Sequence, residues 1–287
     1  MSGNLVVKNN LMFKQIFPKA FPIIGVIHLD PLPGEIGFSK MDSLLDQVKK
    51  SVEIFQKSEV DGILIENASD KPHTMTISKA QVSAMSVLVK QAVNQTKVPI
   101  GVTCLLLDWE ANFAIAKATG AKFVRLNVFV DKVMRDPDTW KTINTNCRGL
   151  IDINPLAVKS YRKMLNAEKI LLLADIHVKY MIMLEPKKTI DLSAKQAEFY
   201  GADAIIVSGN RTGLPTDVKD TVQAKNACNI PVLIGSGLVK RDIPNLLSKA
   251  DGAIIGTAFE KEEGNIIFSQ VNSFMKQVNK LRKNHEK

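Results

Sequence analysis

Short apolar runs alternate along this chain with longer segments in which apolar residues recur every three or four positions. The short runs are typical of buried strands, and the longer segments are typical of amphipathic helices, as at Leu44, Val48 and Val52. The pattern predicts eight strands, at residues 22–28, 61–66, 98–104, 122–127, 170–175, 202–207, 230–234 and 252–255. Eight successive strand–helix units favour an α/β fold of the closed (β/α)8 type, the TIM barrel, over an open doubly wound sheet.

The connections between these elements indicate how the chain is divided. Gly120 and Gly201 each stand between a predicted helix and the next strand, where glycine commonly ends a helix. No Pro/Gly/Ser-rich linker interrupts the chain, so we expect one barrel domain over residues 21–287, preceded by an N-terminal arm or helix at 1–20. No GxGxxG motif follows the first strand, which argues against a dinucleotide-binding fold.

One interval, residues 129–154, is longer than an ordinary connection and carries Pro137, Trp140 and Cys147. Two interpretations are open. The segment forms a lid over the mouth of the barrel, or it is a surface excursion that only packs on the barrel.

The run from Ile170 to Lys179 has two faces of different chemistry. Every second position on one face is apolar, whereas the other face begins with two leucines and ends in Asp175, His177 and Lys179. A strand that turns polar only at its carboxyl end is buried on both faces until it opens into a site. This run is therefore expected to be an inner barrel strand.

The carboxyl ends of TIM-barrel strands converge on one pocket, so polar residues at all predicted strand ends are considered together. His73 and His285 do not follow a strand directly and are treated as bystanders. The candidates for catalysis are His28, Glu66, Asp108, Asp175, His177 and Lys179, and those for substrate binding are Asp30, Asn67, Asp70, Arg125 and Asn127.

Arg125 is predicted to point into the barrel, where a charge is costly to desolvate unless a carboxylate faces it. Asp175, on the neighbouring strand, is the expected partner, with Glu66 next. Such a pair serves either the chemistry of the site or only the structure, because polar groups inside barrels often satisfy one another.

The last three predicted strands end in small and hydroxyl-bearing residues. Backbone N–H groups in such turns bind anions, and barrels commonly hold a phosphate at this place. The alternative is that the turns merely require glycine. The candidate phosphate-binding residues are Gly209, Thr212, Gly235, Ser236, Gly237, Gly256 and Thr257.

Composition narrows the classes of partner. The 287 residues carry a net charge of +9, which favours anionic partners, although lysines spread over helices are commonly a solvated face. Nucleic acid is not expected, because the chain has only 6% aromatic residues and no Cys/His finger spacing. A phosphorylated small molecule is the expected partner, and a homo-oligomer is a further option.

Cysteine usage and hydropathy indicate the compartment. The three cysteines are far apart and form no CxxC, which fits a reducing, cytoplasmic location. No apolar run approaches the length of a transmembrane helix. Residues 1–29 contain three lysines and no Asp or Glu, so a mitochondrial or other organellar transit segment is the alternative.

Six motifs are specific in combination: residues 25–34 (GVIHLDPLPG), 66–70 (ENASD), 125–128 (RLNV), 173–179 (LADIHVK), 208–213 (SGNRTG) and 235–237 (GSG). Together they resemble the BtpA family of barrel proteins, which also includes the SgcQ-like proteins, from Phe21 to about Lys280. The resemblance implies a TIM barrel of the ribulose-phosphate-binding kind. The family name comes from a role in photosystem I accumulation, and related members look like sugar-phosphate enzymes.

The chain departs from the family pattern in three places. Family members usually carry Asn-x-Leu-Arg-Asn-Asp after the third strand, where residues 103–108 are TCLLLD here. Tyr180 stands where His is frequent, and the Asp-Gln-Gly loop after the fourth strand is not recognisable at 133–142. If those residues contact substrate in relatives, this chain uses a different substrate or has lost activity.

The leading hypothesis is an enzyme that acts on a small phosphorylated sugar or nucleotide-derived metabolite by acid/base chemistry, as a lyase, isomerase or hydrolase. The alternative is a non-catalytic assembly or stability factor, as in photosystem I biogenesis, that binds a partner protein or an anionic membrane surface. No cofactor is identified, but converging carboxylates could hold a divalent cation such as Mg²⁺.

Overall fold

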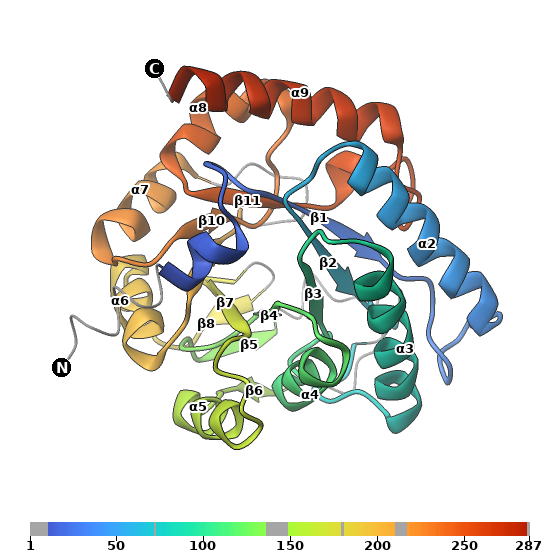
Figure 1. The fold of residues 1–287 in the computed structure, drawn as a ribbon. Coiled ribbons are helices and arrows are strands. Elements are labelled where there is room, and N and C mark those ends of the chain that lie inside the picture. The colour runs from blue at the N-terminus through green and yellow to red at the C-terminus, as the bar shows by residue number, and fades with distance from the viewer. Residues whose placement is uncertain (1–10, 72, 136–148, 179–180, 210–216, 286–287) are drawn as a thin grey trace.

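The computed structural model describes residues 11–71, 73–135, 149–178, 181–209 and 217–285. Eight parallel strands close into a barrel in the order β1-β11-β10-β9-β7-β4-β3-β2, with helices around the outside (Figure 1). Each strand lies within two residues of its predicted bounds, so the predicted (β/α)8 barrel is confirmed. The barrel strands are β1 Ile23–His28, β2 Gly62–Glu66, β3 Ile100–Thr103, β4 Phe123–Leu126, β7 Leu171–Ile176, β9 Ala204–Val207, β10 Val232–Ile234 and β11 Gly252–Ile255.

The helices begin and end at residues suited to those positions. Ser78 and Gln81 form a reciprocal capping box at the start of α3, and Gly120 and Gly201 end α4 and α6 in the left-handed conformation, as predicted. The helices are α2 Met41–Lys57, α3 Lys79–Gln95, α4 Trp109–Thr119, α5 Pro155–Met164, α6 Ile190–Tyr200, α7 Val218–Ala227, α8 Ile243–Leu246 and α9 Phe268–His285, with 3-10 turns η1 Lys240–Asp242, η2 Leu247–Lys249 and η3 Thr257–Phe259.

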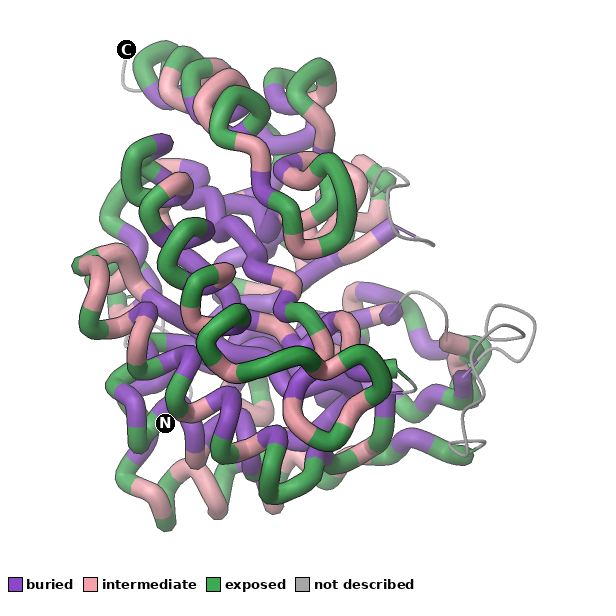
Figure 2. The backbone as a smooth tube through the Cα atoms, turned by 90° about the vertical axis from the view of Figure 1, so that its right-hand side faces the viewer, coloured by how far each residue is buried: buried purple, intermediate pink, exposed green. Residues whose placement is uncertain are grey.

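The two faces of each strand contribute to different cores. On β7, Leu172 and Ala174 pack outward against the helices, whereas Leu171 and Leu173 fill the barrel interior. Figure 2 shows the buried positions gathered at the centre and the exposed ones on the outer sides of the helices. The alternation in the sequence is therefore the alternation between the interior and the helix layer.

The amino-terminal end of the barrel is closed by aromatic side chains. Residues 11–16 are helical, and Phe13 and Phe17 stack with ring centroids 5.0 Å apart. Phe17 in turn packs edge-on against Phe123 at 5.6 Å, within the interior cluster. Since this end is filled, the polar strand ends on the opposite side provide the opening.

The interval after β4 forms part of a second, smaller sheet. Strands β5 Val133–Arg135, β6 Leu150–Ile151 and β8 Met181–Met183 pair antiparallel in the order β6-β5-β8. Val133 and Ile151 pack in one cluster with residues that follow the barrel strands, namely Leu106, Leu107, Val128 and Val178. The described part of the interval thus packs on the barrel mouth, and Pro137, Trp140 and Cys147 lie outside the described residues.

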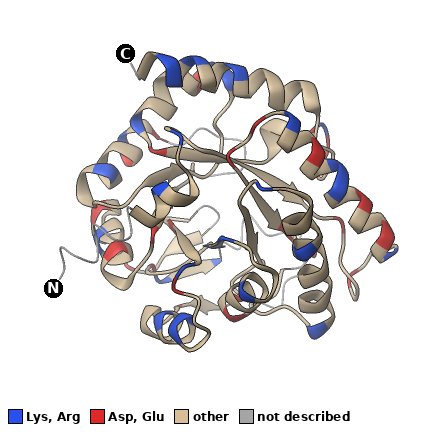
Figure 3. Cartoon of the chain, viewed as in Figure 1, with Lys and Arg blue, Asp and Glu red and all other residues tan. Residues whose placement is uncertain are grey.

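The charges lie mainly on the outer helices. In Figure 3 the Lys and Arg positions are spread over several helices, and along α2 they are interspersed with Asp and Glu. Within the described residues, no helix combines the length and the apolar character needed to cross a bilayer.

Candidate active site

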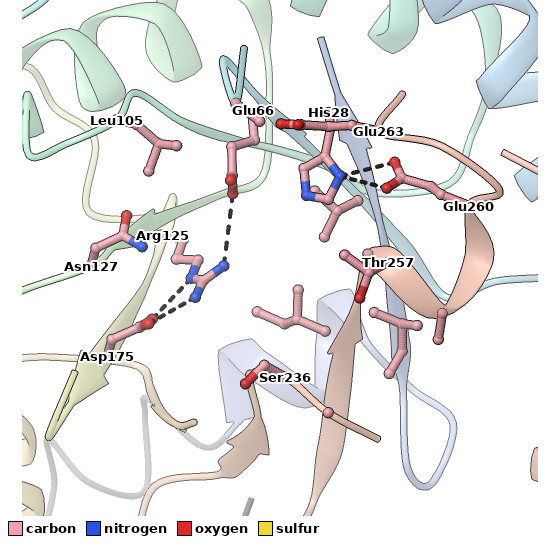
Figure 4. Close-up of a pocket in the computed structure, with 18 of the residues that line it drawn as sticks. His28, Glu66, Leu105, Arg125, Asn127, Asp175, Ser236, Thr257, Glu260 and Glu263 are labelled. Atoms are coloured by element: carbon pink, nitrogen blue, oxygen red, sulfur yellow. Dashed lines mark hydrogen bonds and ion pairs between the residues drawn. The ribbon is translucent and has the colours of Figure 1, made fainter. Parts of the chain in front are cut away.

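A cavity of about 510 Å³ opens at the carboxyl ends of the barrel strands. Figure 4 shows labelled side chains from several strands directed toward one open space. The structure thus brings together candidates from six strand ends, as expected of a TIM barrel. The predicted site residues that line the cavity are His28, Glu66, Arg125, Asn127, Asp175, Gly235, Ser236, Gly237, Gly256 and Thr257.

Arg125 and Asp175 form a two-point ion pair across adjacent strands. Arg125 Nε donates to Asp175 Oδ1 at 2.9 Å, and its NH2 donates to Oδ2 at 2.8 Å. Glu66 Oε2 lies 3.8 Å from NH1. Burial alone lowers the pKa of Arg125, but Asp175 and Glu66 outweigh it and raise the pKa above its ordinary range. The guanidinium therefore stays charged.

His28, at the end of β1, is held by a carboxylate. Its Nδ1 lies 2.9 Å from both carboxylate oxygens of Glu260. Burial lowers the pKa of His28, but the hydrogen bond with Glu260 and the charges of Glu66, Glu260 and Glu263 more than compensate and raise it. Figure 4 shows the other ring nitrogen facing the open centre of the cavity. An imidazole so oriented can exchange a proton at Nε2.

Glu260 was not predicted as a site residue. It follows η3 in the connection after β11, where it forms an isolated bridge with Ile266, and Gly264 N donates to its Oε1 at 3.2 Å. Its side chain is only 3% exposed. The one signal in the sequence is its place shortly after the eighth strand, because no strand periodicity assigns a direction to a loop residue.

The glycine-rich ends of β10 and β11 form one wall of the cavity. Residues 235–237 and Gly256-Thr257 all line it. A Cβ on Gly256 would lie 2.6 Å from Cε1 and 3.1 Å from Nε2 of His28. The imidazole therefore fits against the β11 end only because residue 256 lacks a side chain.

Asn67 and Asp70, predicted to bind substrate, do not line the cavity. They are buried and bonded to each other, with Asn67 Nδ2 donating to Asp70 Oδ2 at 3.0 Å. Asp70 also accepts from Leu32 N and Gln81 Nε2, and Asn67 Oδ1 accepts from Leu105 N at 2.7 Å. The pair fixes the backbone of neighbouring loops, including the one that carries Leu105.

Asp108 and Asp30 also lie outside the cavity lining. Asp108 caps α4 by accepting from Ala111 N at 2.9 Å, and its other oxygen accepts from Ile77 N at 2.9 Å. Both carboxylate oxygens thus serve the backbone. Asp30 is exposed, and its backbone N–H donates to Gln47 Oε1 at 3.1 Å.

His177 does not continue the inward face of β7. The strand ends at Ile176, and His177 has a φ of 48°, which breaks the alternation. Its backbone N–H donates to Asp131 at 2.8 Å, and the residue is not part of the cavity lining. Gly209 is buried and likewise does not line the cavity, whereas Lys179 and Thr212 lie outside the described residues.

His73 lines the cavity, although its sequence position did not predict this. Its backbone oxygen accepts from Arg135 NH2 at 2.9 Å. Burial lowers the pKa of His73, so its imidazole is neutral near pH 7. The cavity also includes Leu105, Leu106, Val178 and Met181, which give it an apolar side.

No metal site emerges from the part of the chain that the structure describes. Among these residues, no group of three or more His, Cys, Asp or Glu side chains is arranged to hold an ion. Two of the carboxylates that line the cavity, Asp175 and Glu260, are engaged by Arg125 and His28.

Solved structures with the same fold include enzymes of phosphorylated compounds. The (S)-3-O-geranylgeranylglyceryl phosphate synthase of Thermoplasma acidophilum, in complex with its substrate sn-glycerol-1-phosphate, gives a TM-score of 0.57 at 13% identity over 95% of this chain and 98% of that one. The thiamine phosphate pyrophosphorylase of Pyrococcus furiosus gives 0.56 at 15% identity over 93% and 98%. At these identities the likeness establishes the TIM-barrel fold.

Sequence relatives are closer. An uncharacterized protein of Pyrococcus abyssi is 34% identical over 244 residues, 85% of this chain and 88% of its own length. Photosystem I biogenesis protein BtpA of Synechocystis is 32% identical over 255 residues, 88% and 84% of the two chains. A Caenorhabditis elegans protein named as mitochondrial is 29% identical over 272 residues, 91% and 94%. Because the BtpA family model matches residues 19–280, nearly the whole barrel, this chain belongs to the BtpA family.

Proposed function

We propose that this chain is an enzyme that acts on a small phosphorylated sugar or nucleotide-derived metabolite by acid/base chemistry at the carboxyl end of the barrel. The observation that carries this proposal is the contact between His28 and Glu260 in a cavity that also includes the glycine-rich ends of β10 and β11. A proton-transfer group and an anion-binding wall face the same volume. The phosphorylated substrate of the T. acidophilum synthase, on a barrel of the same fold, supports it by analogy.

The phosphate binds against residues 235–237 and Gly256-Thr257. Short turns without bulky side chains let backbone N–H groups approach an anion, and the hydroxyls of Ser236 and Thr257 add donors. Lys261 also lines the cavity and forms no ion pair with a described residue, so its ammonium is available to the same anion.

His28 transfers the proton. When the ring is neutral and Nδ1 donates to Glu260, Nε2 is the acceptor and can act as a base, whereas the protonated ring donates from Nε2 as an acid. Glu260 fixes the orientation of the ring, in the way a carboxylate orients a catalytic histidine. Arg125 stabilises negative charge that develops on the substrate, and Glu66 supplies a second carboxylate. Lyases, isomerases and hydrolases all use such transfers.

A screen of pooled phosphorylated metabolites for turnover tests the proposal. We expect His28→Asn and Glu260→Gln to keep the protein folded and to reduce the turnover found by about a hundredfold or more, the usual contribution of acid/base catalysis. His285→Asn, on exposed α9, is the matched control and should be as active as the parent chain. Full activity in His28→Asn, or no phosphorylated substrate at all, contradicts the proposal.

The alternative function is a non-catalytic assembly or stability factor. Its support is the name of the Synechocystis relative as a photosystem I biogenesis protein, together with the net charge of +9. This alternative predicts binding to a partner or to anionic phospholipid vesicles that weakens as salt rises and that His28→Asn leaves intact. Vesicle co-sedimentation with both proteins distinguishes the two functions.

We propose that the chain acts in the cytoplasm; the alternative is an organelle, which the name of the C. elegans relative as a mitochondrial protein supports. Imaging of a carboxyl-terminal fluorescent fusion decides between them. Light scattering at defined concentrations tests for a homo-oligomer.

A further inference from the structure

The cavity has two ends that face each other across the barrel. In the closed order of eight strands, β3 stands four strands away from β10, and β4 stands four strands away from β11. The loops after β3 and β4 therefore lie opposite the proposed phosphate-binding turns. Figure 4 shows this arrangement, with Leu105 and Asn127 on one side and Ser236 and Thr257 on the other.

An apolar wall extends from the end opposite the phosphate-binding turns to the residues after β7. Leu105 and Leu106 follow β3, and Val178 and Met181 follow β7, and all four line the cavity. Leu106 and Val178 are at most 9% exposed and pack in one cluster with Val133 of β5. The described residues of the small sheet pack behind this wall. They therefore limit the length of an apolar group that can bind here.

Two uncharged hydrogen-bonding side chains stand beside the wall. Asn127 accepts one long contact from Thr103 Oγ1, at 3.4 Å, and its amide nitrogen donates to no other residue in the described ranges. His73 is placed next to Leu106, because Leu106 N donates to Thr74 O at 2.8 Å. Apolar surface combined with a neutral amide and an imidazole suits a flat heteroaromatic ring, which presents apolar faces and polar edges.

The charged groups lie between the two ends. His28 with Glu260, and Arg125 with Asp175 and Glu66, come from strands that lie between or beside the two walls. A ligand that spans the cavity places its middle at these groups. The cavity has a volume of about 510 Å³, which is large enough for a ligand bigger than a bare sugar phosphate.

Resting on the function proposed above, we propose that the substrate is a nucleoside monophosphate or a closely related ribosyl phosphate that carries an uncharged planar ring. The phosphate binds at β10 and β11, the ring binds at Leu105, Leu106, Val178 and Met181, and the ribose lies at His28. The bond that reacts is therefore in the sugar or joins the sugar to the ring.

Titration calorimetry of the full chain tests this with inorganic phosphate, ribose 5-phosphate, octyl phosphate and the four common nucleoside 5′-monophosphates. We expect at least one nucleotide to bind about tenfold or more tightly than ribose 5-phosphate, a difference of about 1.4 kcal/mol. If ribose 5-phosphate or octyl phosphate binds as tightly as the tightest nucleotide, the assignment of the ring is overturned, while the phosphate site stands. If none of these compounds binds, the proposed function falls as well.

Variants locate the two ends. Leu105→Asn and Met181→Asn should lower nucleotide affinity to that of ribose 5-phosphate and leave ribose 5-phosphate binding unchanged, whereas Gly237→Asp should abolish both. Met181 is only half-buried, whereas Leu105 is buried, so the Met181 variant keeps the test valid if Leu105→Asn unfolds the chain. Leu184→Asn, at an exposed position outside the cavity, is the matched control. Nucleotide affinity that is unchanged in the folded Met181 variant overturns the placement of the ring.

Discussion

Arg125 and Asp175 lie 50 positions apart in the sequence and meet through two hydrogen bonds, at 2.9 and 2.8 Å, from adjacent strands β4 and β7. The strand register pairs Arg125 with Leu173, so Asp175 lies one inward position further along β7, toward the mouth. The guanidinium reaches it with its planar edge, which matches the two carboxylate oxygens. The barrel itself thus places a compensated charge in the wall of the cavity.

Replacing one partner of this ion pair should destabilise the chain strongly, because the other partner stays buried without its counter-charge. Arg125→Met leaves Asp175 buried without its partner, and Asp175→Asn leaves the guanidinium with only Glu66 at 3.8 Å. We expect each single substitution to lower the free energy of unfolding by about 3 kcal/mol, and the double variant to lose less than the sum. Urea denaturation in a double-mutant cycle measures this, and additive losses would count against the coupling.

Arg162 and Asp203 provide the control for function. They form another ion pair, with Arg162 NH2 2.7 Å from Oδ2 of the buried Asp203, which also accepts from Leu172 N at the start of β7. Arg162→Met should therefore destabilise the chain without lowering the turnover per folded molecule, whereas Arg125→Met should lower both stability and turnover. Equal effects on turnover from the two variants would show that the loss reflects general instability.

The contact between His28 and Glu260 predicts how stability depends on pH. The pKa of His28 is raised in the folded state above its ordinary value of 6.5. Its stabilising contribution is then fully present below about pH 6.5 and is lost as the pH rises through the raised folded-state pKa. The difference in unfolding free energy between the parent chain and His28→Asn should shrink as the pH rises above about 6.5. A difference that grows over this range would show that the pKa is lowered instead.

Gly256→Ala should displace His28. The added Cβ would lie 2.6 Å from the ring, whereas a Cβ on Gly149 meets no atom within 4 Å. We expect Gly256→Ala to lower the turnover found in the metabolite screen at least tenfold and to alter the chemical shift and titration of the His28 ring in NMR. Gly149→Ala, the matched control, should do neither. An unperturbed His28 signal in Gly256→Ala would mean that the loop yields instead of the imidazole.

The sequence predicts those site residues that lie on strands, because a period of two fixes which way each side chain points. This rule pairs Arg125 with Asp175, and the two side chains meet in the structure. The same rule misplaced His177, which was expected to extend the inward face. The rule fails there because β7 ends at Ile176 and the backbone turns through a φ of 48°.

Loop residues follow no such rule. Glu260 reaches His28 only because the connection after β11 turns back through the Glu260–Ile266 bridge, a non-local pairing that periodicity does not encode. His73 is positioned by the pairing of Leu106 N with Thr74 O, which joins the loops after β2 and β3. The sequence thus predicts where a candidate site lies at the strand ends. The loop residues that complete the site can be identified only from the folded structure.

Asp108 allows a structural role to be tested against a catalytic one. Its residue type and its place after β3 predict catalysis, whereas its contacts indicate a structural role. Both of its oxygens are used by the backbone, one at Ala111 N and one at Ile77 N. Loss of a helix cap costs about 1 kcal/mol, and an unsatisfied buried N–H adds about 1–3 kcal/mol. Asp108→Ala should therefore lower stability by about 2–4 kcal/mol, with Asp108→Asn intermediate because its amide keeps one acceptor oxygen. The turnover per folded molecule should stay that of the parent chain in both variants. Denaturation and activity measured on the same samples check this, and a folded Asp108→Ala protein without activity would return Asp108 to the catalytic residues.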